Sequence, residues 1–155
     1  MRKADCAIYF LFTAIVVLAA ASCTPEACFD ETESFVKATF YNTAKKKASA
    51  PDSVSLYGFG HESAMIYNKS TGVQPAQFPL NDNSDTSRFV IKINGVTDTL
   101  VFVYTSFPHL VSRECGFTIY HTLDTVLTTN HNIDYIYQAN DNVTTTNEEN
   151  IQISY

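Results

Sequence analysis

The fold is decided between residues 87 and 105, which read SRFVIKINGVTDTLVFVYT. Asn94-Gly95 suits a type I′ turn, because both central residues of that turn need positive φ. Two loops are open: a two-residue loop opposes Ile93 to Val96, and a longer loop through Thr99 opposes Ile93 to Leu100. Side chains alternate along strands, so both registers place the same residues on one face: Phe89, Ile91, Ile93, Leu100, Phe102 and Tyr104. The stretch predicts a hairpin with a fixed core face and an open register.

Short β-type runs separated by turn residues continue on both sides of this hairpin. Their spacing of about 8–12 residues is typical of a sandwich or barrel. In one run, Cys115, Phe117 and Ile119 share a face. We predict an all-β fold, a two-layer antiparallel β-sandwich of about 8–9 strands over residues 35–155. The expected strands are 35–41, 53–59, 63–67, 87–93, 99–105, 114–123, 133–139 and 150–155, with 77–80 as a further edge strand.

The first 22 residues have the pattern of a lipoprotein signal peptide, with a positive start and an apolar run over residues 7–21. That run falls short of the roughly 20 residues that span a bilayer, which favours a cleaved signal over a retained membrane anchor. Cleavage before Cys23 would let its thiol take a diacylglycerol, although Ala20 stands where Leu is usual. A cut after Ala21 is the alternative, and it would leave Cys23 as an ordinary residue.

The number of cysteines favours lipidation. Cys6 leaves with the signal, and the remaining Cys23, Cys28 and Cys115 form an odd set, which is awkward in an exported protein. A lipid on Cys23 leaves Cys28 and Cys115 as an even pair in an oxidising compartment, and we expect a disulfide between them. Closing so long a loop constrains the unfolded chain by about 4–5 kcal/mol in the loop-entropy model. Two buried free thiols are the alternative.

Residues 23–34 are polar and acidic, and we expect them to form a lipidated tether. The chain has 10 basic and 16 acidic residues, of which the signal removes two and one, so the mature chain has 8 and 15 and a net charge near −7. An acidic chain without a basic stripe cannot neutralise phosphates, so we expect no nucleic-acid partner. It is equally poor for docking on anionic lipids. Membrane attachment is therefore expected through the N-terminal lipid.

Four histidines invite the hypothesis of a metal site, which their spacing does not support. His61-Glu62 begins like a zinc helix motif, but no second His follows four residues later. His121 and His131 are separated by a loop, with Asp134 near, and solvated histidines at strand ends explain them better. We therefore expect no metal.

Catalysis has no support in the sequence either. There is no Gly-x-Ser-x-Gly elbow, and pairs such as Glu148-Glu149 lie in polar stretches rather than in the apolar pockets that raise a carboxyl pKa. The turn at residues 81–85 is rich in oxygen atoms but lacks the Gly and the bidentate Glu of a calcium loop. We expect neither an enzyme nor a cofactor.

Several short motifs follow one another in a familiar order. The chain resembles a domain-of-unknown-function family of small Bacteroidetes lipoproteins over nearly all of its mature part. The resemblance implies an envelope lipoprotein with β structure, loosely associated with an outer-membrane-protein family, and it implies no activity. Ala20 departs from the usual lipobox. The motifs are Cys23 with Cys28 close behind, Ser55-Leu56-Tyr57-Gly58, Pro79-Leu80, Asp98-Thr99-Leu100, Ser112-Arg113-Glu114-Cys115-Gly116-Phe117 and Glu149-Asn150-Ile151-x-Ile153.

Two functions remain open on these grounds. The first is a structural or interaction lipoprotein of the cell envelope, expected on the outer membrane, whose partner is another outer-membrane or periplasmic protein. An open sheet edge could recruit a partner strand. The second is a glycan or small-ligand binding module, for which Tyr57, Tyr67, Tyr135 and Tyr137 are candidate stacking residues.

Overall fold

The computed structural model describes residues 28–155, so the predicted signal peptide, Cys23 and the start of the tether lie outside the described residues. Among the residues it describes, no helix is long and apolar enough to cross a membrane. Residues 28–155 instead form eleven strands. They are β1 (Phe35–Asn42), β2 (Lys47–Ala48), β3 (Val54–Gly58), β4 (Met65–Ser70), β5 (Ala76–Pro79), β6 (Thr86–Ile93), β7 (Val96–Ser112), β8 (Gly116–Thr128), β9 (Tyr135–Gln138), β10 (Asn142–Val143) and β11 (Ile151–Ser154).

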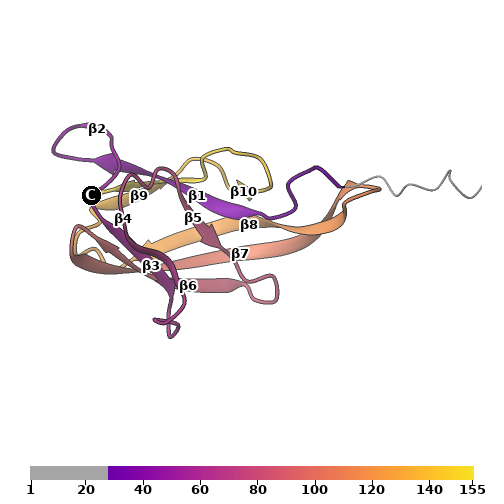
Figure 1. Ribbon diagram of the computed structural model, residues 1–155, viewed down its shortest axis with the longest axis horizontal. Helices are drawn as coiled ribbons and strands as arrows, with labels where there is room; N and C mark the ends of the chain where they lie inside the picture. Colours follow the sequence, from indigo (N-terminus) through magenta and orange to yellow (C-terminus); the bar gives the residue numbers. More distant parts are fainter. Residues whose placement is uncertain (1–27) are drawn as a thin grey trace, which may run out of the picture.

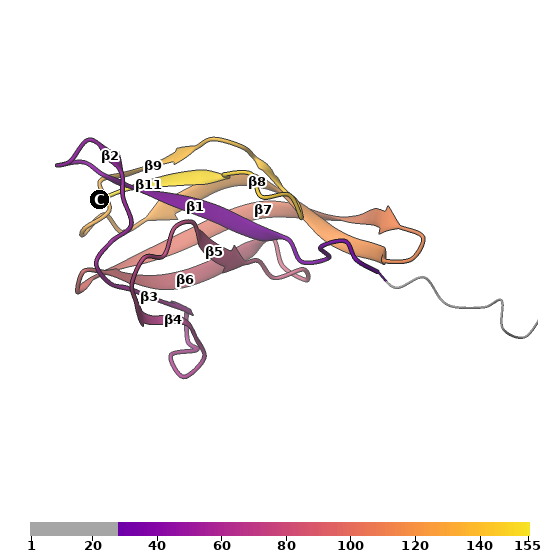
Figure 2. The ribbon, with the colours of Figure 1, turned by 45° about the horizontal axis from the view of Figure 1, so that its top comes forward.

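The strands form two sheets that pack face to face, which confirms the predicted β-sandwich (Figures 1 and 2). Sheet A has the order β2-β1-β11-β9, and β5 also pairs with β1. Sheet B has the order β10-β8-β7-β6-β3-β4. The two longest strands, β7 and β8, continue beyond both layers as a projecting hairpin (Figure 1).

The Asn94-Gly95 turn joins β6 to β7 as a two-residue loop. Asn94 has φ 50° and Gly95 has φ 94°, as a type I′ turn requires. Ile93 is opposite Val96 and Phe89 is opposite Leu100, so the shorter of the two predicted registers is the one adopted. All six residues of the predicted core face are buried.

The core lies between the sheets and takes alternate residues from both. Phe78 of sheet A lies 5.4 Å from Phe89 and 5.2 Å from Phe102 of sheet B, measured between ring centroids. Tilted and edge-on aromatic contacts of this kind contribute about 0.5–1.5 kcal/mol each beyond the area they bury. The aromatic contacts therefore join the two layers at the centre of the sandwich.

One strand pair departs from the antiparallel expectation. β11 lies between β1 and β9, and it runs parallel to β1 with Ala38 opposite Ile151. Asn150 fixes this register at the start of β11: its Oδ1 accepts the Lys37 amide at 3.0 Å, and its Nδ2 donates to the Asn142 carbonyl at 2.8 Å. No short loop can connect two parallel neighbouring strands, so a tight turn cannot fix their register. Here the Asn150 side chain fixes the register of β1 against β11.

The limits of the nine predicted strands agree with the structure within about three residues except in β7 and β8. The two-residue strands β2 and β10 were not predicted, so the sandwich has eleven strands rather than 8–9. β7 was expected to end at Thr105 but continues to Ser112, and β8 continues to Thr128 rather than Leu123. Cys115 lies in the turn between them, so the expectation that it shares a strand face with Phe117 and Ile119 is wrong. The outer parts of β7 and β8 pair with each other without a second sheet above them.

Candidate functional site

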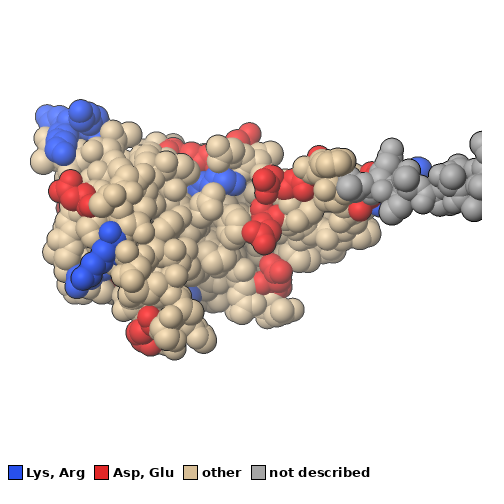
Figure 3. All heavy atoms as spheres, in the orientation of Figure 1, with Lys and Arg blue, Asp and Glu red and all other residues tan. Residues whose placement is uncertain are grey.

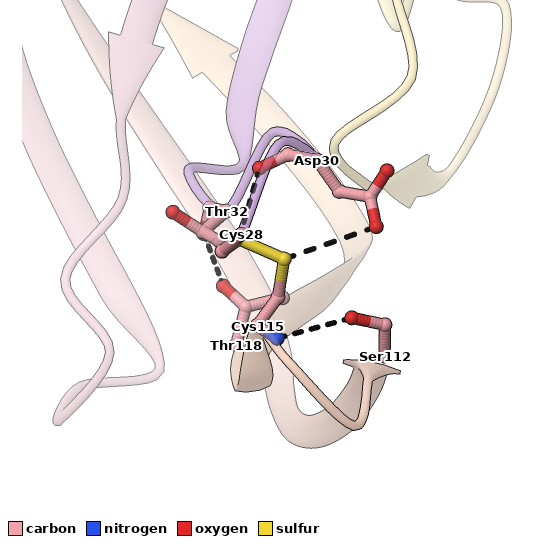
Figure 4. The surroundings of a disulfide bond; sticks show 6 residues. All are labelled: Cys28, Asp30, Thr32, Ser112, Cys115 and Thr118. Atoms are coloured by element: carbon pink, nitrogen blue, oxygen red, sulfur yellow. Dashed lines mark hydrogen bonds between the residues drawn. A yellow bond between two sulfur atoms is a disulfide. The ribbon is translucent and has the colours of Figure 1, made fainter. Parts of the chain in front are cut away.

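The predicted disulfide between Cys28 and Cys115 is present, with the two Cα atoms 4.8 Å apart (Figure 4). It joins the first described residue to the turn at the tip of the β7–β8 hairpin. Two hydrogen bonds continue the attachment along β8: the Ser34 hydroxyl donates to the Ile119 carbonyl at 2.6 Å, and the Thr118 hydroxyl donates to the Thr32 carbonyl. The segment 28–34 is therefore held along the hairpin from tip to base.

The hairpin tip, residues 107–120, carries exposed apolar side chains on both of its faces. Leu110 and Phe117 lie directly opposite each other and are 50% and 72% exposed. On the other face, Phe107 is exposed and meets the Tyr120 ring edge-on at 6.3 Å. Phe29, next to the disulfide, is 92% exposed. The alternation of side chains along β8 was predicted from the sequence. The pattern gave no indication that the face with Phe117 would not be covered by a second sheet.

The outer face of sheet B carries a second apolar surface, which crosses five strands. We call it the sheet B strip: Met65, Tyr57, Val90, Val101 and Leu127, from β4, β3, β6, β7 and β8 in turn. Register pairs connect Met65 to Tyr57, Tyr57 to Val90, and Val101 to Leu127. Tyr57, Val90 and Val101 are half-buried and the two ends are exposed.

Polar and cationic residues border the sheet B strip. Arg88 is opposite Val101, and its guanidinium carbon lies 5.0 Å from the centroid of the exposed Phe59 ring. Lys92 and Thr99 lie on the same face, as register partners of Ser55 and Val90. The arrangement is an apolar centre with a polar rim.

The four candidate tyrosines do not share a face, so the single platform they suggested is not formed. Tyr57 belongs to the sheet B strip, and Tyr67 packs against the core with its hydroxyl accepting the Gln77 amide at 3.1 Å. Tyr135 and Tyr137 are exposed on β9, and Tyr41 lies on the same face two strands away, because Ser154 is opposite both Tyr41 and Tyr135. We call Tyr41, Tyr135 and Tyr137 the sheet A tyrosines.

The histidines are placed differently from one another. His131 is exposed, as expected, but the expectation of a solvated His121 is wrong: its side chain is buried, and its Nδ1 lies 2.8 Å from the Ser106 hydroxyl. Burial lowers the pKa of His121 below its ordinary value, against the opposing effect of the Asp82 carboxylate 3.6 Å from Nε2. Within residues 28–155, no three His, Cys, Asp or Glu side chains are grouped as metal ligands would be.

Asp98 is a buried carboxylate that the sequence analysis did not single out for a role. It accepts the amides of His131, Asn132 and Ile133 at 2.6, 2.8 and 3.1 Å, and the Thr129 hydroxyl at 2.8 Å. Burial alone would raise the pKa of Asp98, but these donors outweigh it and hold the pKa below its ordinary value. Asp98 therefore organises the β8–β9 loop. The available signal was its position in phase with Leu100 and Phe102 on the core face.

The turn at residues 81–85 uses its own oxygen atoms. The Asn81 carbonyl accepts the Tyr104 hydroxyl at 2.9 Å, and the Asn81 Oδ1 accepts the Asn83 amide at 2.9 Å. The Ser84 hydroxyl oxygen accepts the Thr86 amide at 3.1 Å. The turn is thus a local hydrogen-bonded structure tied to the core through Tyr104.

The fold and its N-terminal disulfide define a small, disulfide-bonded β-sandwich protein. A model of the family of unknown function DUF6452 matches residues 53–155, and the chain belongs to this family. No curated protein and no solved structure matches the chain. The resemblance to an uncharacterised family is confirmed at that level.

Proposed function

We propose that this protein is a lipid-anchored, non-catalytic interaction module of the cell envelope, which binds another envelope protein through the sheet B strip. In this proposal residues 1–22 are removed, Cys23 carries the lipid, and the outer membrane holds the product. The apolar start of the chain supports export. The Cys28–Cys115 disulfide supports an oxidising compartment and leaves Cys23 as the unpaired cysteine of the mature chain.

The observation that carries the interaction role is the composition of the sheet B strip and its border. Tyr, Met and Arg are enriched at protein interfaces, and Tyr and Arg supply a large share of binding hot spots. Tyr57 and Met65 lie next to each other in register, and Arg88 borders the centre of the strip. Both Arg88 and Lys92 are basic in an otherwise acidic chain, which favours a partner with an apolar patch and acidic residues beside it.

Site-specific crosslinking in cells tests the strip. A photoreactive phenylalanine analogue at Leu127 is expected to give one discrete adduct, and the same analogue at Tyr137, on the other sheet, is the control with nearly equal exposure (55% and 57%). Met65→Asp, at the opposite end of the strip, should abolish the Leu127 adduct, whereas Tyr135→Asp should not. Adducts of equal strength at both positions would contradict the proposal. An affinity tag belongs in the exposed turn at residues 44–46, because residue 155 follows a central strand.

The lipid anchor is tested separately. The mature protein from cells should have the mass of residues 23–155 plus the lipid, and Cys23→Ser should move it from the membrane fraction to the soluble fraction. A parent protein that begins at Ser22, or that keeps the first 22 residues, would contradict lipidation.

A second function is favoured by a specific observation, the sheet A tyrosines. Two exposed rings on one short strand, with a third ring on the same face, can stack on the apolar faces of sugars. Tyr135→Ala with Tyr137→Ala should then remove binding on a glycan array without changing the Leu127 adduct. Glycan binding that survives this double variant would exclude the sheet A tyrosines as its site.

A further inference from the structure

The hairpin tip is a two-stranded ribbon that carries apolar residues on both of its faces. Such a distribution is unusual for a segment that no second sheet covers. Leu110 and Phe117 form one face, next to the pair Pro108–Ile119, and Phe107 with Tyr120 lies on the other. A second sheet would cover one face and leave the other in water. The most exposed of the apolar side chains, Phe29 and Phe117, lie at the end of the hairpin, close to the disulfide in the sequence.

The tip also lies where the chain approaches its anchor. Cys23 precedes Cys28 by five residues, which span at most about 18 Å when extended, and Cys28 is bonded to the tip at Cys115. The apolar run that ends at residue 21 is only two residues farther away. Either way of attaching the chain to a membrane, by lipid or by a retained apolar segment, therefore brings the hairpin tip next to the bilayer.

We propose that the hairpin tip inserts into the interfacial layer of the lipid bilayer, beside the N-terminal lipid, with Leu110, Phe117 and Phe29 as the inserted side chains. This inference deepens the proposed function and rests on its membrane attachment. Apolar and aromatic side chains at the headgroup boundary are the chemistry by which proteins lie on membranes without crossing them. The insertion sets how the domain is oriented on the membrane.

Length and charge agree with a shallow insertion. From the pair Ser106–His121, of which His121 is buried, to the end of β7 at Ser112, six residues extend the hairpin by about 20 Å. The headgroup layer on each side of a bilayer is about 5–7 Å thick. The tip contains one arginine and one glutamate, Arg113 and Glu114, whose charges cancel, and one histidine, His109. The apolar end can therefore be immersed while the base of the hairpin stays in water.

Acidic residues limit the depth and select the lipid. Asp30, Glu31 and Glu33 lie in the segment attached along the hairpin. Figure 3 shows acidic side chains in a band across the middle of the molecule. Lysines and arginines gather toward the end near β2, with a further basic group beside the acidic band. Anionic headgroups repel this band. Insertion should therefore be stronger in zwitterionic than in anionic bilayers, and added salt should reduce the difference.

The chain contains no tryptophan, so a single introduced tryptophan reports its own surroundings. The mature protein, residues 23–155, is prepared without lipid, and a maleimide lipid is coupled to Cys23, the one thiol left free by the disulfide. Phe117→Trp places the reporter at the tip, and Phe59→Trp, in the turn that follows β3, is the matched control away from the hairpin (72% and 56% exposed). Both variants are bound to phosphatidylcholine vesicles, with and without brominated chains.

Insertion predicts a blue-shifted emission for the tryptophan at position 117 and at least twofold stronger quenching by brominated lipid than for the tryptophan at position 59. Adding Leu110→Ser to Phe117→Trp should reduce the shift, whereas adding Leu127→Ser should not. Equal quenching at both positions would overturn the proposal. So would a blue shift that grows with protein concentration before vesicles are added, because a second copy would then cover the tip.

The chemical coupling separates this test from the proposed function. If cells do not lipidate Cys23, the mass measurement shows it, and the coupled protein still reports whether the tip inserts. If cells do lipidate Cys23 and the tryptophan at position 117 stays in water, the anchor stands and the inserted hairpin is wrong.

Discussion

The β7–β8 hairpin contains two halves that share a backbone and differ in surroundings. In the inner half, Phe102 and Tyr104 are buried against sheet A. In the outer half, Leu110 and Phe117 occupy the continuation of the same face and are exposed. Pairing continues through both halves, with one register shift between Val103 and Tyr104 and another between Leu110 and Ser112. Strand pairing alone therefore does not decide which apolar residues stabilise the fold; the second sheet does.

The largest expected difference comes from equal truncations in the two halves. Phe102→Ala should lower the free energy of unfolding by about 3–5 kcal/mol, because it removes a buried ring and leaves a cavity. Phe117→Ala should change it by less than about 0.5 kcal/mol, because the ring is already in water. Urea unfolding of both variants and the parent measures the difference. Similar losses would show that the outer half is covered in solution.

The disulfide supports the outer half, and its loss ranks second. Replacing Cys28 and Cys115 with Ser should cost about 2–4 kcal/mol, because the unfolded chain loses a cross-link that closes a long loop. Amide exchange should speed up most in residues 107–120. Thermal unfolding without reductant, together with hydrogen exchange, provides the measurement. An unchanged melting temperature would contradict the structural role of the bond.

Asp98 ties the inner half to the β8–β9 loop, and it should make stability depend on acid. Its folded-state pKa lies below the unfolded value. Its contribution is therefore present above the unfolded pKa of about 3.9 and is lost as the pH falls through the folded pKa. Asp98→Asn should lower the free energy of unfolding at pH 7 by about 1–3 kcal/mol. It should also make that free energy depend less steeply on pH in acid, in the part of the curve called the acid limb here. Urea unfolding midpoints between pH 2 and 6 measure this dependence. An acid limb as steep as that of the parent would exclude Asp98 as its source.

His121 lies where the two halves meet, and its effect should be the smallest. Its folded-state pKa is lowered by burial, so the unfolded chain binds the proton more readily. Stability should therefore begin to fall as the pH drops below about 6.5, the unfolded value for histidine. His121→Gln should remove this first decline and leave the Asp98 limb in place. A decline near pH 6 that persists in His121→Gln would assign it to another group.

Much of the sandwich could be predicted from the sequence, because the residues that specify its turns and its core face lie close together in the chain. Asn94-Gly95 specifies a turn by backbone conformation, and alternation then fixes the core face on both sides. The disulfide followed from the number of cysteines. These inferences need no knowledge of what lies across the sheet.

The features that the sequence did not reveal depend on distant parts of the chain. Alternation at Leu110 and Phe117 looks the same whether or not a sheet covers it. The parallel pairing of β1 with β11 depends on Asn150 contacting Lys37, 113 residues away. His121 was expected in water because polar residues usually are, and its burial depends on Ser106 and the neighbouring loop.

The central place of β11 in sheet A has a consequence for the order in which the protein is made. Residues 151–154 are synthesised after all the other strands described here, yet they fill the gap between β1 and β9. Until they arrive, both neighbours present unpaired strand edges, which are prone to join other chains. Sheet A therefore stays incomplete until β11 has been synthesised, and a chain cut short before residue 151 would remain a sandwich with one open layer.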